Sequence, residues 1–182
     1  RTGMRRSESI ALRWDDFDDQ RQQLKIRRAA DPSKPRVLKS TKTGTVRTVD
    51  LDTRTRGELN AYKALRMSLS EVFVQPKSLI FGNNQGELRA PNDLSAQWIR
   101  RMKRLSGDIK GLPWVTLKGL RHTHATLLMQ AQENPRIIQE RLGHSDVKTT
   151  LEIYSHVTPT IQREAVNRFE SWLDSNEGEQ ID

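Results

Sequence analysis

The segment Leu117-Lys118-Gly119-Leu120-Arg121-His122-Thr123-His124-Ala125-Thr126 decides how the rest of the sequence is understood. Downstream of it come Leu142-Gly143-His144-Ser145-Asp146 and then Tyr154. An arginine on a helix, a histidine after a helix-ending glycine and a tyrosine on the next helix can converge on one small anion. Because guanidinium groups form paired hydrogen bonds with phosphate, a phosphate is the anion that this set would hold.

A helix is expected to begin near Lys118, because apolar residues recur there at helical spacing. The expected stripe consists of Leu120, His124, Leu127, Leu128 and Ala131. Helical geometry then places Arg121 one turn before His124, on a neighbouring line of the same helix.

A second helix is expected from Arg136 to Leu142, opened by Pro135 in its first turn. Its buried residues should be Ile137, Ile138 and Leu142. Gly143 suits the left-handed residue that ends such a helix, so His144 should lie at a rigid corner.

A third helix, capped by Ser145, should carry Val147, Leu151 and Tyr154 on one face and end at Pro159. Beyond it an amphipathic helix is expected. Its apolar residues are Ile161, Ala165, Val166, Phe169, Trp172 and Leu173. The polar, acidic segment 174–182 is expected to be a disordered tail.

The first part of the chain predicts a short helix and a small sheet. The helix should end before Asp15-Asp16, and three short antiparallel strands are expected at Gln23–Arg27, Arg36–Lys39 and Val46–Leu51, where polar and apolar residues alternate. Between the last two strands Gly44 permits a tight hairpin, which carries Lys42 at or beside its tip.

Two longer helices are expected in the middle of the chain, from Thr53 to about Ser70 and from Pro91 to Gly107. The second carries a basic face formed by Arg100, Arg101, Lys103 and Arg104. Such a face is either a solvated helix surface or a site of phosphate contact.

Composition narrows the class of protein. The chain has 182 residues, a formal net charge of +8 and no cysteine. One domain is the default at this length, and the basic surplus favours a polyanionic partner. The missing cysteines exclude disulfides and fit a reducing interior. No signal peptide or membrane span is visible, so a soluble, intracellular protein is expected, and the start at Arg1 suggests a fragment of a longer one.

Taken in order, the motifs of the chain resemble the catalytic domain of the tyrosine recombinases, the phage integrase family. The motifs are Thr2-Gly3-Met4-Arg5 with Glu8 and Leu12-Arg13-Trp14, Lys42-Thr43-Gly44, Leu120–Thr126, Leu142-Gly143-His144-Ser145, and Ile153-Tyr154-Ser155-His156. Each motif alone is weak, but their shared order over nearly the whole chain is specific. The resemblance implies an α+β fold that is mainly α-helical, with a small three-stranded antiparallel sheet at one edge, and a catalytic domain over 1–173.

The resemblance also implies a set of roles. Arg5 and Arg121 would hold the phosphate, Tyr154 would attack it, and Lys42 would give a proton to the leaving 5′ oxygen. His144 would donate a hydrogen bond to the same phosphate or orient it. The product would be a 3′-phosphotyrosyl link, so the reaction would need no ATP, metal or other cofactor.

Lys118 stands where the family usually has a histidine, three residues before the second arginine. A lysine there can still contact the phosphate, but it is a poorer base at neutral pH unless its pKa is lowered. Glu8 matches the family's acidic residue after the first arginine, and a supporting role is expected for it. DNA contacts are predicted for Lys39, Arg47, Arg100, Arg101 and Arg104.

Each residue also has a plainer interpretation. A lone Tyr154 on an apolar stripe is usually a core residue, Arg121 a structural ion-pair partner and Lys42 a solvated hairpin lysine. The histidines show no fixed metal-ligand pattern, and without cysteine a zinc site is not expected.

The favoured function is a site-specific recombinase that integrates or excises a phage or mobile element. A DNA-binding regulator that kept the fold without catalysis is one alternative, and a type IB topoisomerase-like enzyme is another. The expected partners are duplex DNA attachment sites, a homo-tetramer on DNA formed from free monomers, and accessory DNA-bending proteins. The expected location is the cytoplasm of a bacterial host, at the nucleoid, with no membrane association.

Overall fold

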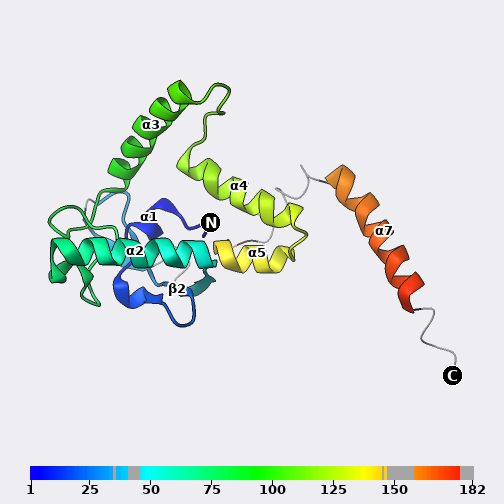
Figure 1. The fold of residues 1–182 in the computed structure, drawn as a ribbon, viewed down its shortest axis with the longest axis horizontal. Helices are drawn as coiled ribbons and strands as arrows, with labels where there is room; N and C mark the ends of the chain where they lie inside the picture. The colour runs from blue at the N-terminus through cyan, green and yellow to red at the C-terminus, as the bar shows by residue number, and fades with distance from the viewer. Residues whose placement is uncertain (35, 41–45, 145, 147–157, 177–182) are drawn as a thin grey trace.

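Helices form most of the structure, a computed structural model that describes residues 1–34, 36–40, 46–144, 146 and 158–176 (Figure 1). The helices are α1 (Arg6–Ser9), α2 (Thr53–Leu69), α3 (Pro91–Asp108), α4 (Leu117–Gln130), α5 (Pro135–Leu142) and α7 (Thr158–Asn176), with 3-10 turns η1 (Trp14–Asp16) and η2 (Glu71–Val74). The strands are β1 (Phe17–Asp18), β2 (Gln23–Ile26), β3 (Arg28–Ala30), β4 (Leu38–Ser40) and β5 (Arg47–Asp50). The expected α+β fold, mainly α-helical, is confirmed.

The strands form two antiparallel sheets among the described residues. In the larger sheet β2 lies between β1 and β5, with Leu24 opposite both Phe17 and Val49. β4 pairs instead with β3, placing Lys39 opposite Ala29.

The assignment of all three predicted strands to one sheet was therefore wrong. The segment expected as the middle strand pairs with β3, and the third member of the larger sheet is β1. With only two residues, β1 is too short to show the alternation from which strands are predicted.

One apolar cluster holds the larger sheet against α2. Its buried members are Leu12, Trp14, Leu24, Ile26, Val49, Leu51, Leu59 and Ile80. Alternate residues of β2 and β5 point into this cluster, and Tyr62 of α2 stacks on Phe81 at its border, with ring centroids 5.7 Å apart. The sheet is thus anchored on one face, as expected for half-buried antiparallel strands.

A second cluster joins α4 to α5 through Ala125, Met129, Ile138 and Leu142, all of them at most 1% exposed. The predicted helix ends are confirmed here: Pro135 opens α5, and Gly143 follows it with a φ of +67°. The expected burial of Ile137 was wrong, since it is 51% exposed. α5 packs with one narrow stripe on α4, and Ile137 lies outside that stripe.

The apolar stripe expected on α4 is also only partly buried, because Leu120 and Leu127 are 42% and 57% exposed.

α7 includes Pro159 near its start and runs to Asn176, so the start of the segment expected as a tail is helical. Proline fits the first turn of a helix, where its missing N–H is not needed. The helix expected from Ser145 to Pro159 lies outside the described residues, apart from Asp146 and its last two residues.

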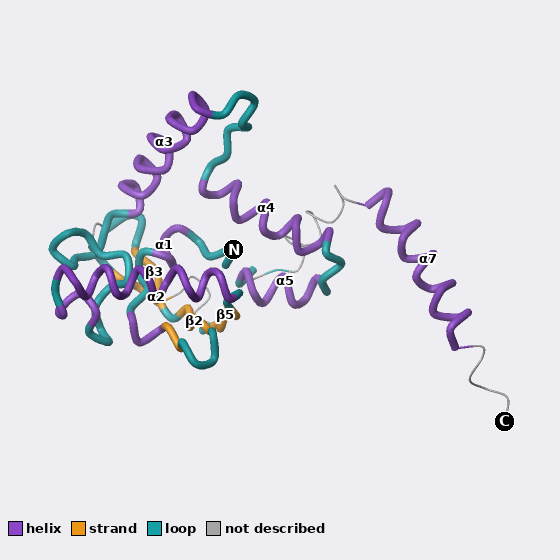
Figure 2. Tube along the Cα trace, in the orientation of Figure 1, coloured by secondary structure: helices purple, strands orange, loops and turns teal. Residues whose placement is uncertain are grey.

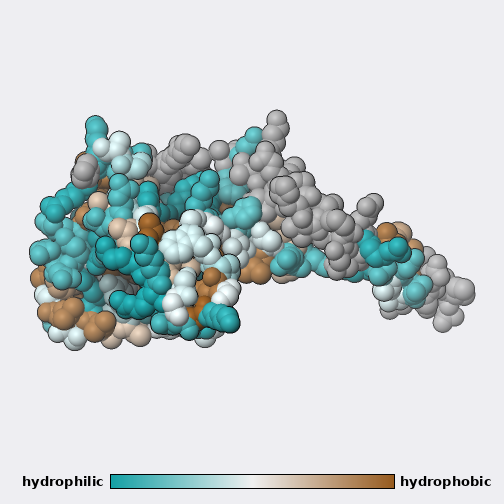
Figure 3. Space-filling view, turned by 90° about the horizontal axis from the view of Figure 1, so that it is seen from above, coloured by the Kyte–Doolittle hydropathy of each residue, from teal (hydrophilic) through white to brown (hydrophobic). Residues whose placement is uncertain are grey.

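The arrangement of the helices places α5 between α4 and the sheet (Figure 1). The tube in Figure 2 shows α2 running along the sheets, α3 and α4 rising above them, and α7 apart from the other helices. Seen from above, hydrophilic side chains cover much of the visible face of the described residues (Figure 3). None of the helices found in the described ranges could cross a membrane.

Candidate active site

The buried carboxylate of Glu8 is the centre of the candidate site. Glu8 is 2% exposed and accepts hydrogen bonds from two arginines. The guanidinium of Arg47 donates to both of its oxygens at 2.9 and 2.7 Å, and Arg5 donates from Nη1 and from its backbone N–H, both at 2.8 Å. Glu8 therefore fixes the start of α1 and the side chain of Arg5.

Arg5 and Arg121 both reach the turn that ends α5. Arg5 Nη2 donates to the carbonyl of Gly143 at 2.6 Å, and Arg121 donates from Nη2 to the carbonyl of Leu142 at 2.5 Å. The other terminal nitrogen of Arg121 donates to the carbonyl of Gly3 at 2.6 Å. Two guanidinium groups from distant parts of the sequence thus lie against the same turn, which continues into His144.

Gly3 must be a glycine for this geometry. Its φ is +65°, a conformation that other residues rarely adopt. A Cβ atom at this position would lie 2.5 Å from Cδ2 of His124 and 2.5 Å from Cδ2 of Leu142. The absence of a side chain lets the backbone approach closely enough for its carbonyl to accept from Arg121.

The arginines and the buried surroundings shift the pKa values of the site. Burial, together with the positive charge of Arg5, lowers the pKa of Arg121 to about 10. Burial, together with the positive charges of Arg121 and then Arg5, lowers the pKa of His144 to about 4. At neutral pH the guanidinium therefore remains charged, while the imidazole is neutral.

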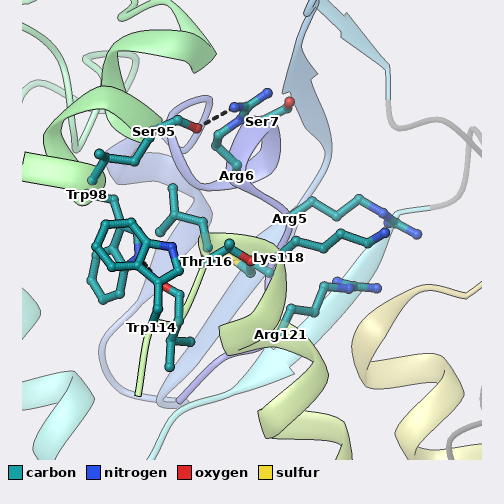
Figure 4. A pocket seen from close by; sticks show the side chains of 13 residues that line it. Arg5, Arg6, Ser7, Ser95, Trp98, Trp114, Thr116, Lys118 and Arg121 are labelled. Atoms are coloured by element: carbon teal, nitrogen blue, oxygen red, sulfur yellow. Dashed lines mark hydrogen bonds between the residues drawn. The ribbon is translucent and has the colours of Figure 1, made fainter. Parts of the chain in front are cut away.

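A cavity of about 500 Å³ borders the arginines (Figure 4). The side chains of Arg5, Lys118 and Arg121 extend alongside one another in this view, and Trp98 and Trp114 line the other side. Lys118 is exposed, in the first turn of α4. Positive groups from α4 and from Arg5, the residue before α1, thus meet beside one open cavity.

The structure accounts for only some of the predicted catalytic residues. It brings Arg5, Lys118 and Arg121 to one cavity, and the two arginines to the turn that carries His144. Lys42 and Tyr154 lie outside the described residues. Among the residues that the structure does describe, no three His, Asp or Glu side chains are grouped so that they could hold a metal ion.

The residues predicted to bind DNA occupy different environments. Arg100, Arg101 and Arg104 are exposed on α3 and line a separate cavity of about 370 Å³. Lys39 is exposed on β4, with its ammonium group 3.7 Å from Asp31.

Arg47 is different, because its side chain is only 11% exposed and lies on Glu8. We infer a structural role for Arg47 in place of the predicted DNA contact. A signal in the sequence could have revealed this role. On an alternating strand from Val46 to Leu51, Arg47 falls on the same face as Val49 and Leu51, which are both buried. A charged residue on a buried face requires a buried partner, and Glu8 is that partner.

Comparison with known proteins agrees with this architecture. The model of the phage integrase family matches residues 1–160. The integrase of Staphylococcus phage L54a is 31% identical over 179 residues, which cover 93% of this chain and 49% of the relative. The tyrosine recombinase XerC of Corynebacterium glutamicum is 31% identical over 170 residues, covering 92% and 47%. The chain thus spans about half the length of the curated relatives it matches.

Among solved structures, the integrase of the Tn1549 transposon in complex with a circular intermediate DNA has the same fold. The TM-score is 0.77 at 23% identity, covering 92% of this chain and 55% of that one. Because the family model covers most of the sequence and the architecture agrees, the chain belongs to the phage integrase family.

Proposed function

We propose that this protein is a site-specific DNA recombinase that cuts and rejoins duplex DNA through a 3′-phosphotyrosyl intermediate. The observation that carries the proposal is the convergence of Arg5, Lys118 and Arg121 on one cavity beside the turn that leads to His144. Three cationic side chains beside an open cavity suit a phosphodiester whose negative charge increases during the reaction.

The reaction would begin when the phenol oxygen of Tyr154 attacks the scissile phosphorus. A bond forms between that oxygen and phosphorus, and the bond from phosphorus to the 5′ oxygen breaks. The phenol gives its proton to water, and the ammonium group of Lys42 gives a proton to the leaving 5′ oxygen. Rejoining reverses these steps with the 5′ hydroxyl of another strand, so bond energy is conserved and no cofactor is required.

The arginines would hold the two non-bridging oxygens of the phosphate. In the structure, Arg5 and Arg121 donate to the carbonyls of Gly143 and Leu142. Guanidinium groups with five donors each can keep such contacts and still offer donors to a phosphate. The neutral imidazole of His144 has one ring N–H to donate, and Lys118 would add positive charge at the phosphate.

Several properties of the relatives support DNA as the substrate. Relatives are named integrase and tyrosine recombinase, and the Tn1549 integrase was solved with a circular intermediate DNA. The basic surplus of the chain, +8 at pH 7, favours the same partner.

Exposed arginines on α3 would contact the DNA backbone. The reaction would take place in a bacterial cytoplasm, at the nucleoid.

We further propose that the protein is a monomer in solution and forms a tetramer on two DNA sites, with DNA-bending proteins as accessory partners. α7 supports this assembly, because Val166 and Phe169 are 49% and 60% exposed. An apolar helix face that its own chain leaves open is suited to contact a neighbouring subunit.

The decisive experiment is to trap the protein on nicked duplex DNA that carries the recombination site of the element that encodes it. The nick lets the 5′ fragment diffuse away, so a covalent adduct should accumulate, and mass spectrometry should find the nucleotide on Tyr154. The variant Tyr154→Phe should bind the same DNA without forming an adduct. DNA binding by the wild type with no adduct would instead indicate a regulator. Relaxation of plasmids that lack the site would indicate a topoisomerase-like enzyme.

A further inference from the structure

Arg47 connects three parts of the candidate site. It lies on β5, the strand that follows the segment containing Lys42, and it donates hydrogen bonds from both terminal nitrogens to Glu8 of α1. Its third donor, Nε, reaches the carbonyl of Arg141 in α5 at 3.0 Å. All three kinds of guanidinium nitrogen are therefore used inside the protein.

The carboxylate of Glu8 is equally occupied. Each of its oxygens accepts one hydrogen bond from Arg47 and one from Arg5, at distances between 2.7 and 2.9 Å. Burial by itself would raise the pKa of Glu8, but the hydrogen bonds and charge of Arg47, followed by those of Arg5, lower it below its ordinary value. Glu8 therefore stays ionised and has little capacity left for a substrate.

Arg47 also packs against the turn that precedes His144. A Cβ atom at Gly143 would lie 2.8 Å from Nη1 of Arg47, so the guanidinium rests directly on this glycine. A second contact joins α5 to β5, because Arg141 donates from Nη2 to the carbonyl of Asp50 at 3.0 Å. The turn is thus held to β5 by the contacts of Arg47 with Arg141 and Gly143 and by the contact between Arg141 and Asp50.

We propose that Arg47 is a positioning residue for strand cleavage: through Glu8 it sets the guanidinium of Arg5, and through Arg141 and Gly143 it sets the turn that carries His144. The inference rests on the proposed recombinase function. Arg47 touches no reacting atom in this scheme. Its hydrogen bonds fix the positions of Arg5 and of the turn with His144 relative to β5.

The residue type matters for this role. A planar guanidinium can donate two parallel hydrogen bonds to a carboxylate and a third in another direction, whereas an ammonium group is a point charge on a flexible stem. Lysine at position 47 could keep the charge beside Glu8, but it would lose the paired geometry and the contact with Arg141. Charge alone should therefore not restore the function of Arg47.

The test compares Arg47→Met and Arg47→Lys with Arg28→Met as a matched control. Arg28 is also a strand arginine with a mostly buried side chain, 16% exposed, and it donates at 3.2 Å to the buried carboxylate of Asp16. Adduct formation is measured in single turnovers on saturating nicked site DNA, together with the Kd for DNA and the Tm of each protein. Because a small misplacement of reacting groups is costly, we expect both Arg47 variants to cleave at least about tenfold more slowly. We expect their Kd to change less than about threefold, since the guanidinium of Arg47 is engaged inside the protein.

A modified substrate separates positioning from loss of stability. In this DNA a methyl group replaces one non-bridging oxygen of the scissile phosphate, which removes the negative charge that Arg5 would hold. The cleavage defect of Arg47→Met should shrink on this substrate, as should the defect of Arg5→Ala. A general loss of folded protein would slow both substrates equally, as expected for Arg28→Met if that variant is destabilised.

The outcomes distinguish this inference from the recombinase proposal. If the wild type forms no adduct, the recombinase proposal fails, and Arg47 is judged by the ¹⁵N signals of the Arg5 guanidinium. These signals should move in Arg47→Met and Arg47→Lys but not in Arg28→Met. If the wild type forms the adduct and Arg47→Lys cleaves at the wild-type rate, or if the Arg47→Met defect is equal on both substrates, Arg47 is not a positioning residue.

Discussion

At the scale of single residues, a buried carboxylate explains how several arginines can lie close together. After burial, the charges of Arg5 and Arg47 each lower the pKa of Arg121, because like charges disfavour one another, whereas Glu8 raises it. Glu8 offsets part of this repulsion from its buried position. One buried anion thus reduces the repulsion between the arginines, and the cluster as a whole still carries a net positive charge that can attract a phosphate.

Gly3 gives a direct test of the close contacts in the site. The variant Gly3→Ala should lose about 2 kcal/mol or more of unfolding free energy, because alanine is strained at a φ of +65° and its methyl group would meet His124 and Leu142. Urea denaturation followed by circular dichroism measures the change.

The matched control is Gly57→Ala in α2, where a Cβ atom meets nothing within 4 Å. Alanine is favoured over glycine inside helices, so this variant should gain about 0.5–1 kcal/mol. Equal effects of the two substitutions would contradict the packing described for Gly3.

The lowered pKa values of two histidines, His124 and His144, predict how the stability of the protein depends on pH. Burial lowers the pKa of His124 to about 4, followed by the charge of Arg141, and the pKa of His144 is lowered to about the same value. Their ordinary value is 6.5. Between pH 6.5 and pH 4 the unfolded chain binds protons that the folded chain refuses, so the unfolding free energy should fall as the pH falls.

Urea titrations at pH 7.5, 6.5, 5.5 and 4.5 at constant ionic strength measure this dependence. The variant His144→Asn should show a smaller decrease over the same window. Asp19 and Asp52 have pKa values lowered to about 2, so their contribution is present above their ordinary value of 3.8 and is lost only at lower pH. A stability that stays constant down to pH 4.5 would contradict the buried, neutral state of both histidines.

At the scale of the elements, the packing of α5 on α4 decides where the turn with Gly143 and His144 lies. Ile138 is fully buried in this contact, whereas its neighbour Ile137 is 51% exposed. Ile138→Ala should therefore cost about 2–5 kcal/mol through lost burial and a new cavity. Ile137→Ala should cost less than about 1 kcal/mol, since its side chain is already largely in water.

Thermal and urea unfolding of the two variants gives this comparison directly. In Ile138→Ala the adduct should also form more slowly than in Ile137→Ala under conditions where both proteins are folded. The reason is that Leu142, which packs in the same cluster, provides the carbonyl that accepts from Arg121. A similar loss in both variants would show that α5 does not pack on α4 with the face that the structure shows.

The sequence predicted elements best where strong local signals occur. Pro135 and Gly143 mark the two ends of α5, and both positions agree with the structure. The pairing of the strands could not be predicted, because it depends on contacts between distant segments and on a strand of only two residues. Alternation predicted a strand at Arg36–Lys39, which overlaps β4, but carried no information about its partner, β3.

At the scale of the whole molecule, the sequence predicts several residues of the site but not the hydrogen bonds that join them. The order of the motifs led to Arg5, Lys118, Arg121 and His144, and the fold brings three of them to one cavity and the fourth to the adjoining turn. The paired hydrogen bonds of Arg47 could not be derived from motif order, because they join residues 39 positions apart. Only the arrangement of β5 against α1 and α5 makes this arginine part of the site.

The exposed apolar face of α7 leads to a prediction about how subunits assemble on DNA. Phe169 is 60% exposed on this helix, and its neighbour Glu170 is also exposed. If the apolar face of α7 contacts a neighbouring subunit, Phe169→Ser should leave the Tm of the free protein within about 2 °C, because no buried contact is lost. It should nevertheless abolish complexes of four subunits on two DNA sites and reduce recombination at least about tenfold, because buried aromatic side chains dominate interface energies.

The matched control Glu170→Ser changes an exposed residue beside it and should leave assembly unchanged. Sedimentation of the protein with and without site DNA measures the assembly, and strand exchange between two labelled duplexes measures recombination. A lowered Tm for Phe169→Ser in the free protein would show that α7 packs on its own domain in solution. Unchanged tetramers with unchanged recombination would exclude this face from the contact between subunits, and the assembly would then have to depend on another surface.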